Sequence, residues 1–298
     1  MRLGLVLFLC LLNAGCAILR KDKEEPVDNG PGEAKAEEVL KPSEALKPES
    51  LQLASPVSDR FYMRGTYFQG DVATLIRIDS TNSTTPDGTE LSGEEDLGLD
   101  DVVDQARIEF NVRMAERSNM RIDYFKLNRF SQVTLDEDIE FGDFSFDAGD
   151  QFRSKIDFRD LSLTYTYSLF KGEKIEAGLG FGLHVFEIKA DGGEPGTLSR
   201  EQDSEAGIFP TAAVNFAYRI SKRWAVTARY NGLTVSDDDG EGAYSDAHAD
   251  IQYRWRKNFA IGIGYTRINL DIELSDVDEP FMFNLDTKGP ELFFRASF

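Results

Sequence analysis

The chain has little cysteine, no apolar run long enough for a membrane helix, and far fewer basic than acidic residues. Its two cysteines, Cys10 and Cys16, lie in the first sixteen residues, so the rest of the chain has none with which to form a disulfide. Downstream of residue 16 no segment approaches the roughly 18 consecutive apolar residues of a transmembrane helix. These absences exclude a disulfide-stapled domain and a helical membrane protein.

The charge balance argues against nucleic acid as a partner. The formal net charge is -20, whereas binding to a phosphate backbone needs a basic surface. An acidic chain suits a protein that must stay soluble across the periplasm before it inserts into a membrane. No cofactor motif and no complete EF-hand spacing is present, so we predict neither a cofactor nor a metal site.

The first sixteen residues have the pattern of an export signal. An apolar run extends from Leu3 to Leu12, which is too short to span a bilayer as a helix, and an Ala-Gly-Cys sequence ends at Cys16. That ending resembles the lipobox of bacterial lipoproteins, in which the cysteine is diacylated. The alternative is ordinary cleavage near Ala17 with loss of Cys16. We therefore predict a signal peptide over residues 1–16, of the lipoprotein type if Cys16 is lipidated.

Residues 17–58 are rich in Glu, Lys, Pro, Ala and Ser, and they include no aromatic residue. Such a composition cannot bury enough apolar surface to offset the entropy lost on folding. We predict a disordered periplasmic linker over this segment. The folded domain is then expected over residues 59–298.

Within 59–298, aromatic-rich runs alternate with short polar turns and long acidic connections. Short periplasmic turns and long outer loops in alternation are typical of an outer-membrane β-barrel. The sequence therefore predicts an all-β fold, a closed antiparallel transmembrane barrel of about ten strands, with eight strands as the alternative if one hairpin belongs to an outer loop. The predicted strands are 60–79, 104–115, 119–131, 154–170, 174–189, 207–220, 223–235, 246–256, 258–274 and 288–298.

The last predicted strand places Leu292, Phe294 and Phe298 on one face, with polar residues on the other. This period-two alternation is what a barrel strand in lipid requires. With the strand pattern and the terminal Phe298, residues 60–298 resemble the small outer-membrane β-barrel proteins of Gram-negative bacteria. The resemblance implies an outer-membrane location with a periplasmic N-terminal segment, contact with outer-membrane lipid, and recognition by the barrel assembly machinery through the strand ending in Phe298. The oligomeric state stays open.

In five predicted strands the apolar face changes phase toward the long loops. A β-bulge in each strand would flip the register there. We prefer that the strands project beyond the bilayer, so that the inward face becomes a hydrophobic core. This core either is packed solid or forms an outer-mouth pocket for a lipid or a hydrophobic small molecule. The candidate rim or ligand residues are Ile156, Phe158, Phe186, Ile188, Ile268, Leu270 and Ile272.

The predicted lumen has many side chains of both charges. A ten-strand barrel is narrow, so these side chains are expected to pair and fill it, which argues against a general diffusion porin. His184 has no obvious partner. His248 lies two residues after Asp246, an arrangement that resembles the Asp-x-His pair of omptin proteases, with acids at 136–138 as the opposing group. The other interpretation pairs His248 with a lumen carboxylate.

No serine lies in a Gly-x-Ser-x-Gly nucleophile setting. We predict a non-enzymatic outer-membrane barrel of the cell envelope, with a hydrophobic ligand at its outer mouth as an extension of that role. A narrow channel for small hydrophobic solutes is the alternative. An omptin-like rim protease is the second alternative.

Overall fold

The computed structural model describes residues 56–80, 88–195, 200–236, 240–274 and 281–298. The predicted signal peptide with Cys16, and the predicted linker up to residue 55, lie outside the described residues. The chain divides into two units, Met1–Leu51 and Gln52–Phe298, and the second contains every described residue. A search of the described residues finds no helix that is long and apolar enough to cross a membrane.

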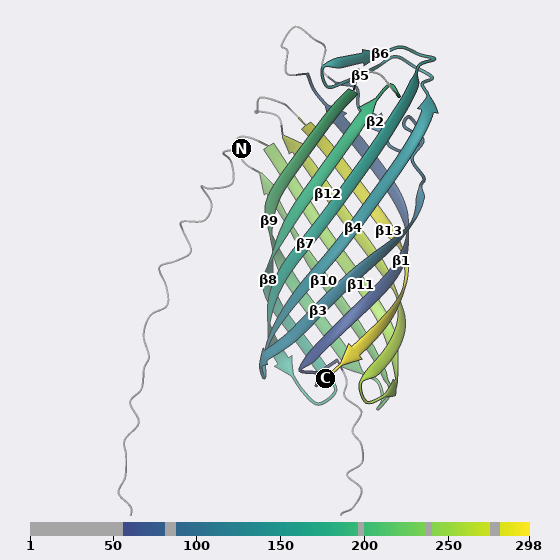
Figure 1. Cartoon of the computed structure of the whole chain (residues 1–298). Helices are drawn as coiled ribbons and strands as arrows, with labels where there is room; N and C mark the ends of the chain where they lie inside the picture. Colours follow the sequence, from purple (N-terminus) through teal and green to yellow (C-terminus); the bar gives the residue numbers. More distant parts are fainter. Residues whose placement is uncertain (1–55, 81–87, 196–199, 237–239, 275–280) are drawn as a thin grey trace, which may run out of the picture. The chain divides into compact units, whose positions relative to one another are not determined.

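Among the described residues, ten long strands form one closed antiparallel barrel (Figure 1). Each strand pairs with the long strands before and after it, and β1 pairs with β13 to close the wall. Closure leaves no sheet edge with unpaired backbone groups, which a bilayer would not tolerate. The strands are β1 (Phe61–Ile78), β3 (Val102–Ala115), β4 (Ser118–Thr134), β7 (Gln151–Lys171), β8 (Ile175–Gly193), β9 (Arg200–Arg219), β10 (Trp224–Ser236), β11 (Gly240–Arg256), β12 (Phe259–Leu274) and β13 (Phe281–Ser297).

Three short strands lie in the long connections. β2 (Leu91–Ser92) adds to β1, while β5 (Ile139–Phe141) and β6 (Phe144–Phe146) form a hairpin of their own. Figure 1 shows β5 and β6 beyond one end of the barrel and the C-terminus at the other. We call the long-loop end the outer end and the short-turn end the inner end, because outer-membrane barrels have long loops outside and short turns in the periplasm.

Toward the inner end, each strand faces apolar side chains outward and polar ones inward. On β7, Leu161 and Leu163 are exposed on the outer surface of the wall, whereas Ser162 and Thr164 are buried in the interior. Alternation with period two follows from the strand itself, since successive side chains point to opposite faces. The result is an apolar band around the outside of the barrel, the pattern typical of a membrane-spanning barrel.

Toward the outer end the same two faces exchange character. On β7, Ile156 and Phe158 point inward and are buried, while Lys155 lies on the outward face and is exposed. The β4–β7 pairing runs without interruption through this change, from Ser118↔Tyr167 to Thr134↔Gln151.

In the described ladders, register shifts occur only beside short turns, at Arg113/Ala115, Ser168/Phe170 and Arg254/Arg256. The exchange of faces therefore does not come from β-bulges. The strands continue past the apolar band, and their interior becomes the hydrophobic side.

The prediction of a closed ten-strand antiparallel barrel is confirmed, and the eight-strand alternative is wrong. Several strands extend further at the outer end than predicted: β9 begins at Arg200 and β13 at Phe281. Their outer parts were expected to be acidic loops because their polar residues suggest solvent. In β13 the polar residues Asn284 and Asp286 alternate with the buried Phe283 and Leu285, so they lie on the outward face of the strand.

Candidate functional site

The interior of the barrel is filled by an apolar core at the outer end. Six of the seven predicted rim residues are at most 3 % exposed, and Ile272 is partly buried against the same cluster. Phe158 lies near Phe125 and Phe186, with ring centroids 6.1 and 5.8 Å away. Each fully buried apolar side chain of this size contributes about 1.5–3 kcal/mol. The sequence-predicted residues thus come together in one cluster. The buried residues of this cluster come from seven of the long strands.

Two loop segments complete this core from above. Leu91, Leu97 and Leu99 of the first long connection are buried in it. From the β5–β6 hairpin, Phe141 and Phe146 pack edge-on against Phe152 of β7, with centroids 5.8 and 5.0 Å away. The described parts of these two loops therefore cover the outer mouth with apolar side chains.

A single buried arginine holds the first of these segments in place. Arg129 of β4 donates to Thr74 Oγ1 at 2.7 Å and to the backbone carbonyl of Asp100 at 2.6 Å, and it pairs with Glu94 at 2.6 Å. Charge-assisted bonds of this kind are stronger than neutral ones. Sequence reasoning missed this contact because Glu94 looks like a solvated loop charge.

His184 marks the lower boundary of the apolar core. Its ring is fully buried 4.4 Å from that of Tyr244, and its Nδ1 lies 3.0 Å from Asp160 Oδ2. The Tyr244 hydroxyl donates to the same carboxylate at 3.2 Å. The expectation that His184 has no obvious partner is wrong, since its partner Asp160 lies on β7 and is distant in sequence.

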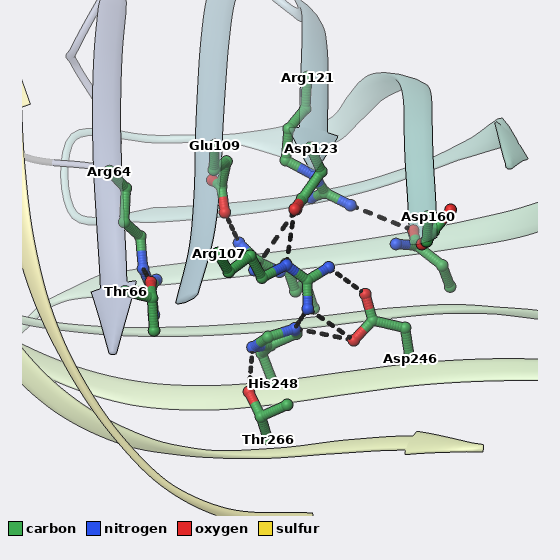
Figure 2. Close-up of polar contacts among 12 residues, drawn as sticks. Arg64, Thr66, Arg107, Glu109, Arg121, Asp123, Asp160, Asp246, His248 and Thr266 are labelled. Atoms are coloured by element: carbon green, nitrogen blue, oxygen red, sulfur yellow. Dashed lines mark hydrogen bonds and ion pairs between the residues drawn. The ribbon is translucent and has the colours of Figure 1, made fainter. Parts of the chain in front are cut away.

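Below this boundary, Arg107 is the centre of a charged network, as Figure 2 shows. Its guanidinium donates to Asp123 at 2.6 Å and to Asp246 at 2.5 Å, and it contacts His248 Nε2 at 2.5 Å. His248 also contacts Thr266 and lies 2.7 Å from Asp246. These groups come from four strands and are all buried.

The network continues toward the inner end through further pairs. Arg64 pairs with Asp250 at 2.7 Å and with Glu291, and Arg229 pairs with Glu109. Buried charges of opposite sign in contact avoid the large penalty that each would bear alone. The charged residues thus fill the lumen as predicted and leave no wide aqueous path along these contacts.

The Asp246–His248 pair lies in this network and away from the rim. Both side chains are at most 2 % exposed, and on the same inward face of β11 the buried Tyr244 lies on the outer side of Asp246. The acids at 136–138 are exposed in the loop between β4 and β5. The structure places His248 with lumen carboxylates, and it does not place the 136–138 acids with it.

The inner half of the lumen contains a polar cavity of about 90 Å³. Five arginines line it, and Glu176 is the only carboxylate among its lining residues in the described chain. Gly178 of β8 also lines it, where a Cβ would lie 2.8 Å from the Tyr167 carbonyl oxygen, so a side chain at this position would force the wall to move. Sequence reasoning did not find this cavity, because the five arginines come from five different strands.

The chain just before β1 closes the inner end. Val57 and Asp59 are each 3 % exposed. Asp59 accepts from Arg254 at 2.6 Å and Arg295 at 2.8 Å, and the Val57 carbonyl accepts from Arg113 at 3.3 Å. Residues 56–58, the only described part of the predicted linker, thus lie against the barrel interior; we call residues 56–59 the inner plug.

Within the described ranges, no group of three or more His, Cys, Asp or Glu side chains is arranged to hold a metal ion. The charged groups of the lumen are instead held by one another. The interior has three parts from outside to inside: an apolar core, a charged network and a polar cavity behind the inner plug.

Comparison with known proteins finds only distant likenesses. No protein-family model matches the chain, and no curated protein matches it in sequence. Among solved structures, the chain is similar to the outer membrane protease OmpT from Escherichia coli, with 10 % identity, a TM-score of 0.44, and coverage of 83 % of this chain and 99 % of that one.

The chain is also similar to the outer membrane protein OprG from Pseudomonas aeruginosa, with 12 % identity and a TM-score of 0.34 over 80 % of this chain and 95 % of that one. The toluene transporter TodX of Pseudomonas putida matches with 8 % identity and a TM-score of 0.31 over 83 % and 94 %. Likenesses this distant carry no function. The closed wall and its apolar band, by themselves, make this chain a β-barrel protein of the Gram-negative outer membrane.

Proposed function

We propose that this protein is a non-enzymatic, non-conducting component of the outer membrane with a sealed barrel. The observation that carries the proposal is the closure of the lumen at three levels, with a small polar cavity left in its inner half. Apolar side chains close the outer end, ion pairs fill the middle, and the inner plug closes the inner end. A barrel built for passage would instead keep a continuous polar path.

The apolar core favours a structural rim over a ligand pocket. Phe158, Leu270 and Phe283 have no exposed surface and belong to one hydrophobic cluster. A ligand pocket needs concave space with a few polar groups that orient the ligand. The rim residues are therefore best explained as the packed top of a barrel that projects beyond the bilayer.

The absence of catalysis is also part of the proposal. A hydrolytic dyad needs a reacting water and a substrate within hydrogen-bond reach of its base. Here Arg107 and Glu291 occupy the surroundings of His248, and the apolar core covers the route from the outer end. This arrangement supports a role for His248 in holding the lumen together.

Planar-bilayer recording of the purified full-length protein tests the proposal directly. We expect no stepwise conductance, with a general porin in the same membrane as the positive control. Sustained single-channel steps would contradict a sealed barrel. Native mass spectrometry of the same sample should show the protein without a stoichiometric apolar molecule; a stoichiometric bound apolar molecule would overturn the packed rim.

Peptide cleavage is the matching test for the enzyme alternative. Wild-type protein and His248→Asn, both checked for folding by their mobility on unboiled gels, should give the same background rate. A wild-type rate well above that of His248→Asn would contradict the non-enzymatic assignment.

A further inference from the structure

The polar cavity of the inner half has an imbalance of charge that the rest of the lumen does not have. Its lining includes Arg64, Arg113, Arg121, Arg229 and Arg295, against the single carboxylate Glu176. Four of these arginines have a carboxylate in direct contact elsewhere in the lumen. The fifth, Arg121, does not.

Arg121 is buried and weakly compensated. Its side chain is 5 % exposed, and its nearest carboxylate oxygen, in Asp123, is 4.0 Å away, beyond hydrogen-bond reach. Asp123 is already engaged by Arg107 at 2.6 Å. The two remaining bonds of the Arg121 guanidinium, to the amide oxygens of Asn215 and Asn231, are long, at 3.4 and 3.3 Å. A buried cation with such partners is expensive unless an anion joins it.

Among the described residues, several buried donors around Arg121 lack a hydrogen-bond partner, and so does Asp123 Oδ2, which lies 4.0 Å from Arg121 Nε. Arg121 Nε, Arg229 Nε and Asn231 Nδ2 are buried, and none has a hydrogen-bond partner in the described part of the chain. Asn119 and Thr166 add further polar groups to the lining. A cluster of guanidinium and amide N–H groups is the donor set that binds an oxyanion, because planar arginine forks match its geometry.

The cavity is large enough for such a ligand. Its volume of about 90 Å³ is several times the ~10–15 Å³ that one water molecule requires by the same kind of measure. Pro56 of the inner plug is among the lining residues. The site therefore lies directly behind the plug, at the periplasmic end of the barrel.

We propose that Arg121, with Arg229 and Asn215, forms a binding site for a small oxyanion of the phosphate class inside the periplasmic end of the lumen. The site is independent of the proposed sealed-barrel role, since an anion bound here adds to the filling of the lumen. Its occupation would complete the charge balance that the protein's own carboxylates leave open.

The test is a phosphate titration of the folded full-length protein in detergent, at constant ionic strength with chloride as the balancing ion. Binding is read by calorimetry and by the midpoint of thermal unfolding. We expect saturable binding and a rising midpoint for the wild type, and at least tenfold weaker binding for Arg121→Gln. Arg267→Gln, which removes an exposed arginine far from the cavity lining, is the matched control and should bind like the wild type.

Asn215→Asp separates anion binding from a merely structural role of Arg121. The new carboxylate would stand where the amide oxygen now accepts from Arg121, so it should keep or raise the stability without phosphate and abolish the response to phosphate. Equal phosphate responses in wild type, Arg121→Gln and Asn215→Asp would overturn the site. So would a response that chloride reproduces and that does not saturate.

Discussion

The two halves of the barrel interior are stabilised in opposite ways. Near the outer end, inward side chains such as Phe158 are apolar and need no partner beyond close packing. Near the inner end, inward side chains such as Arg107 are charged and are stable only through specific partners. The outward face shows the opposite pattern. It is charged near the outer end, as at Lys155, and apolar nearer the inner end, as at Leu163. The strands therefore pass from lipid into water without a change of register, and the level at which the two faces exchange marks the bilayer surface.

The largest expected effect comes from a charge placed in the apolar half. Phe158→Asp would leave an unpaired carboxylate among aromatic rings, with the loss of a fully buried phenylalanine as well, so a destabilisation of more than about 4 kcal/mol is expected. We expect the variant not to fold, as judged by its mobility on unboiled gels after refolding into detergent.

Phe130→Asp is the matched control. Phe130 lies on the outward face of β4 above the apolar band and is 50 % exposed. It should fold normally, since its side chain meets water. Equal folding of both variants would mean that the outer interior is hydrated and that the core is not packed.

In the charged half the expected loss is slightly smaller and can be reversed. Arg107→Met leaves Asp123 and Asp246 buried without their shared cation, which should cost about 3–5 kcal/mol. Adding Asp123→Asn and Asp246→Asn in the same chain should restore much of the stability measured by urea unfolding in lipid vesicles. A triple variant no more stable than Arg107→Met would show that the arginine acts through packing instead of charge.

Much of this comparison could be predicted from the sequence, because it depends on periodicity alone. The ten strands, the exchange of faces and the cluster around Phe158 all follow from which residues alternate. The partner of His184 and the location of His248 could not be predicted, since they depend on which strands meet across the lumen. The same holds for the contact of Arg129 with Glu94 and for the cavity around Arg121, where each group comes from a different part of the chain.

A pair of identical substitutions on the outward face would locate the bilayer surface. Leu163→Arg lies in the apolar band of β7 and should cost about 2–4 kcal/mol in a lipid bilayer if it is near the midplane. Leu75→Arg lies on the outward face of β1 near the outer end and should cost less than about 1 kcal/mol, since the arginine would stay in water. Equilibrium unfolding from vesicles measures both, and similar costs would mean that the bilayer reaches further toward the outer end.

A smaller effect than that of Leu163→Arg is expected at the inner plug, which contacts arginines of the charged half. Asp59→Asn removes the carboxylate shared by Arg254 and Arg295, but both arginines keep other contacts, Arg254 with the Lys257 carbonyl at 2.9 Å and Arg295 with the ring of Tyr62. The expected cost is therefore about 1.5–3 kcal/mol, the range for a hydrogen bond to a charged group. It should appear as faster protease cleavage before β1 while the barrel itself stays folded. Asp71→Asn, on the exposed face of β1, is the control and should leave cleavage unchanged. If Asp59→Asn is cleaved no faster than the control, the plug is held by Val57 and its backbone bonds, and the Asp59 carboxylate does not contribute.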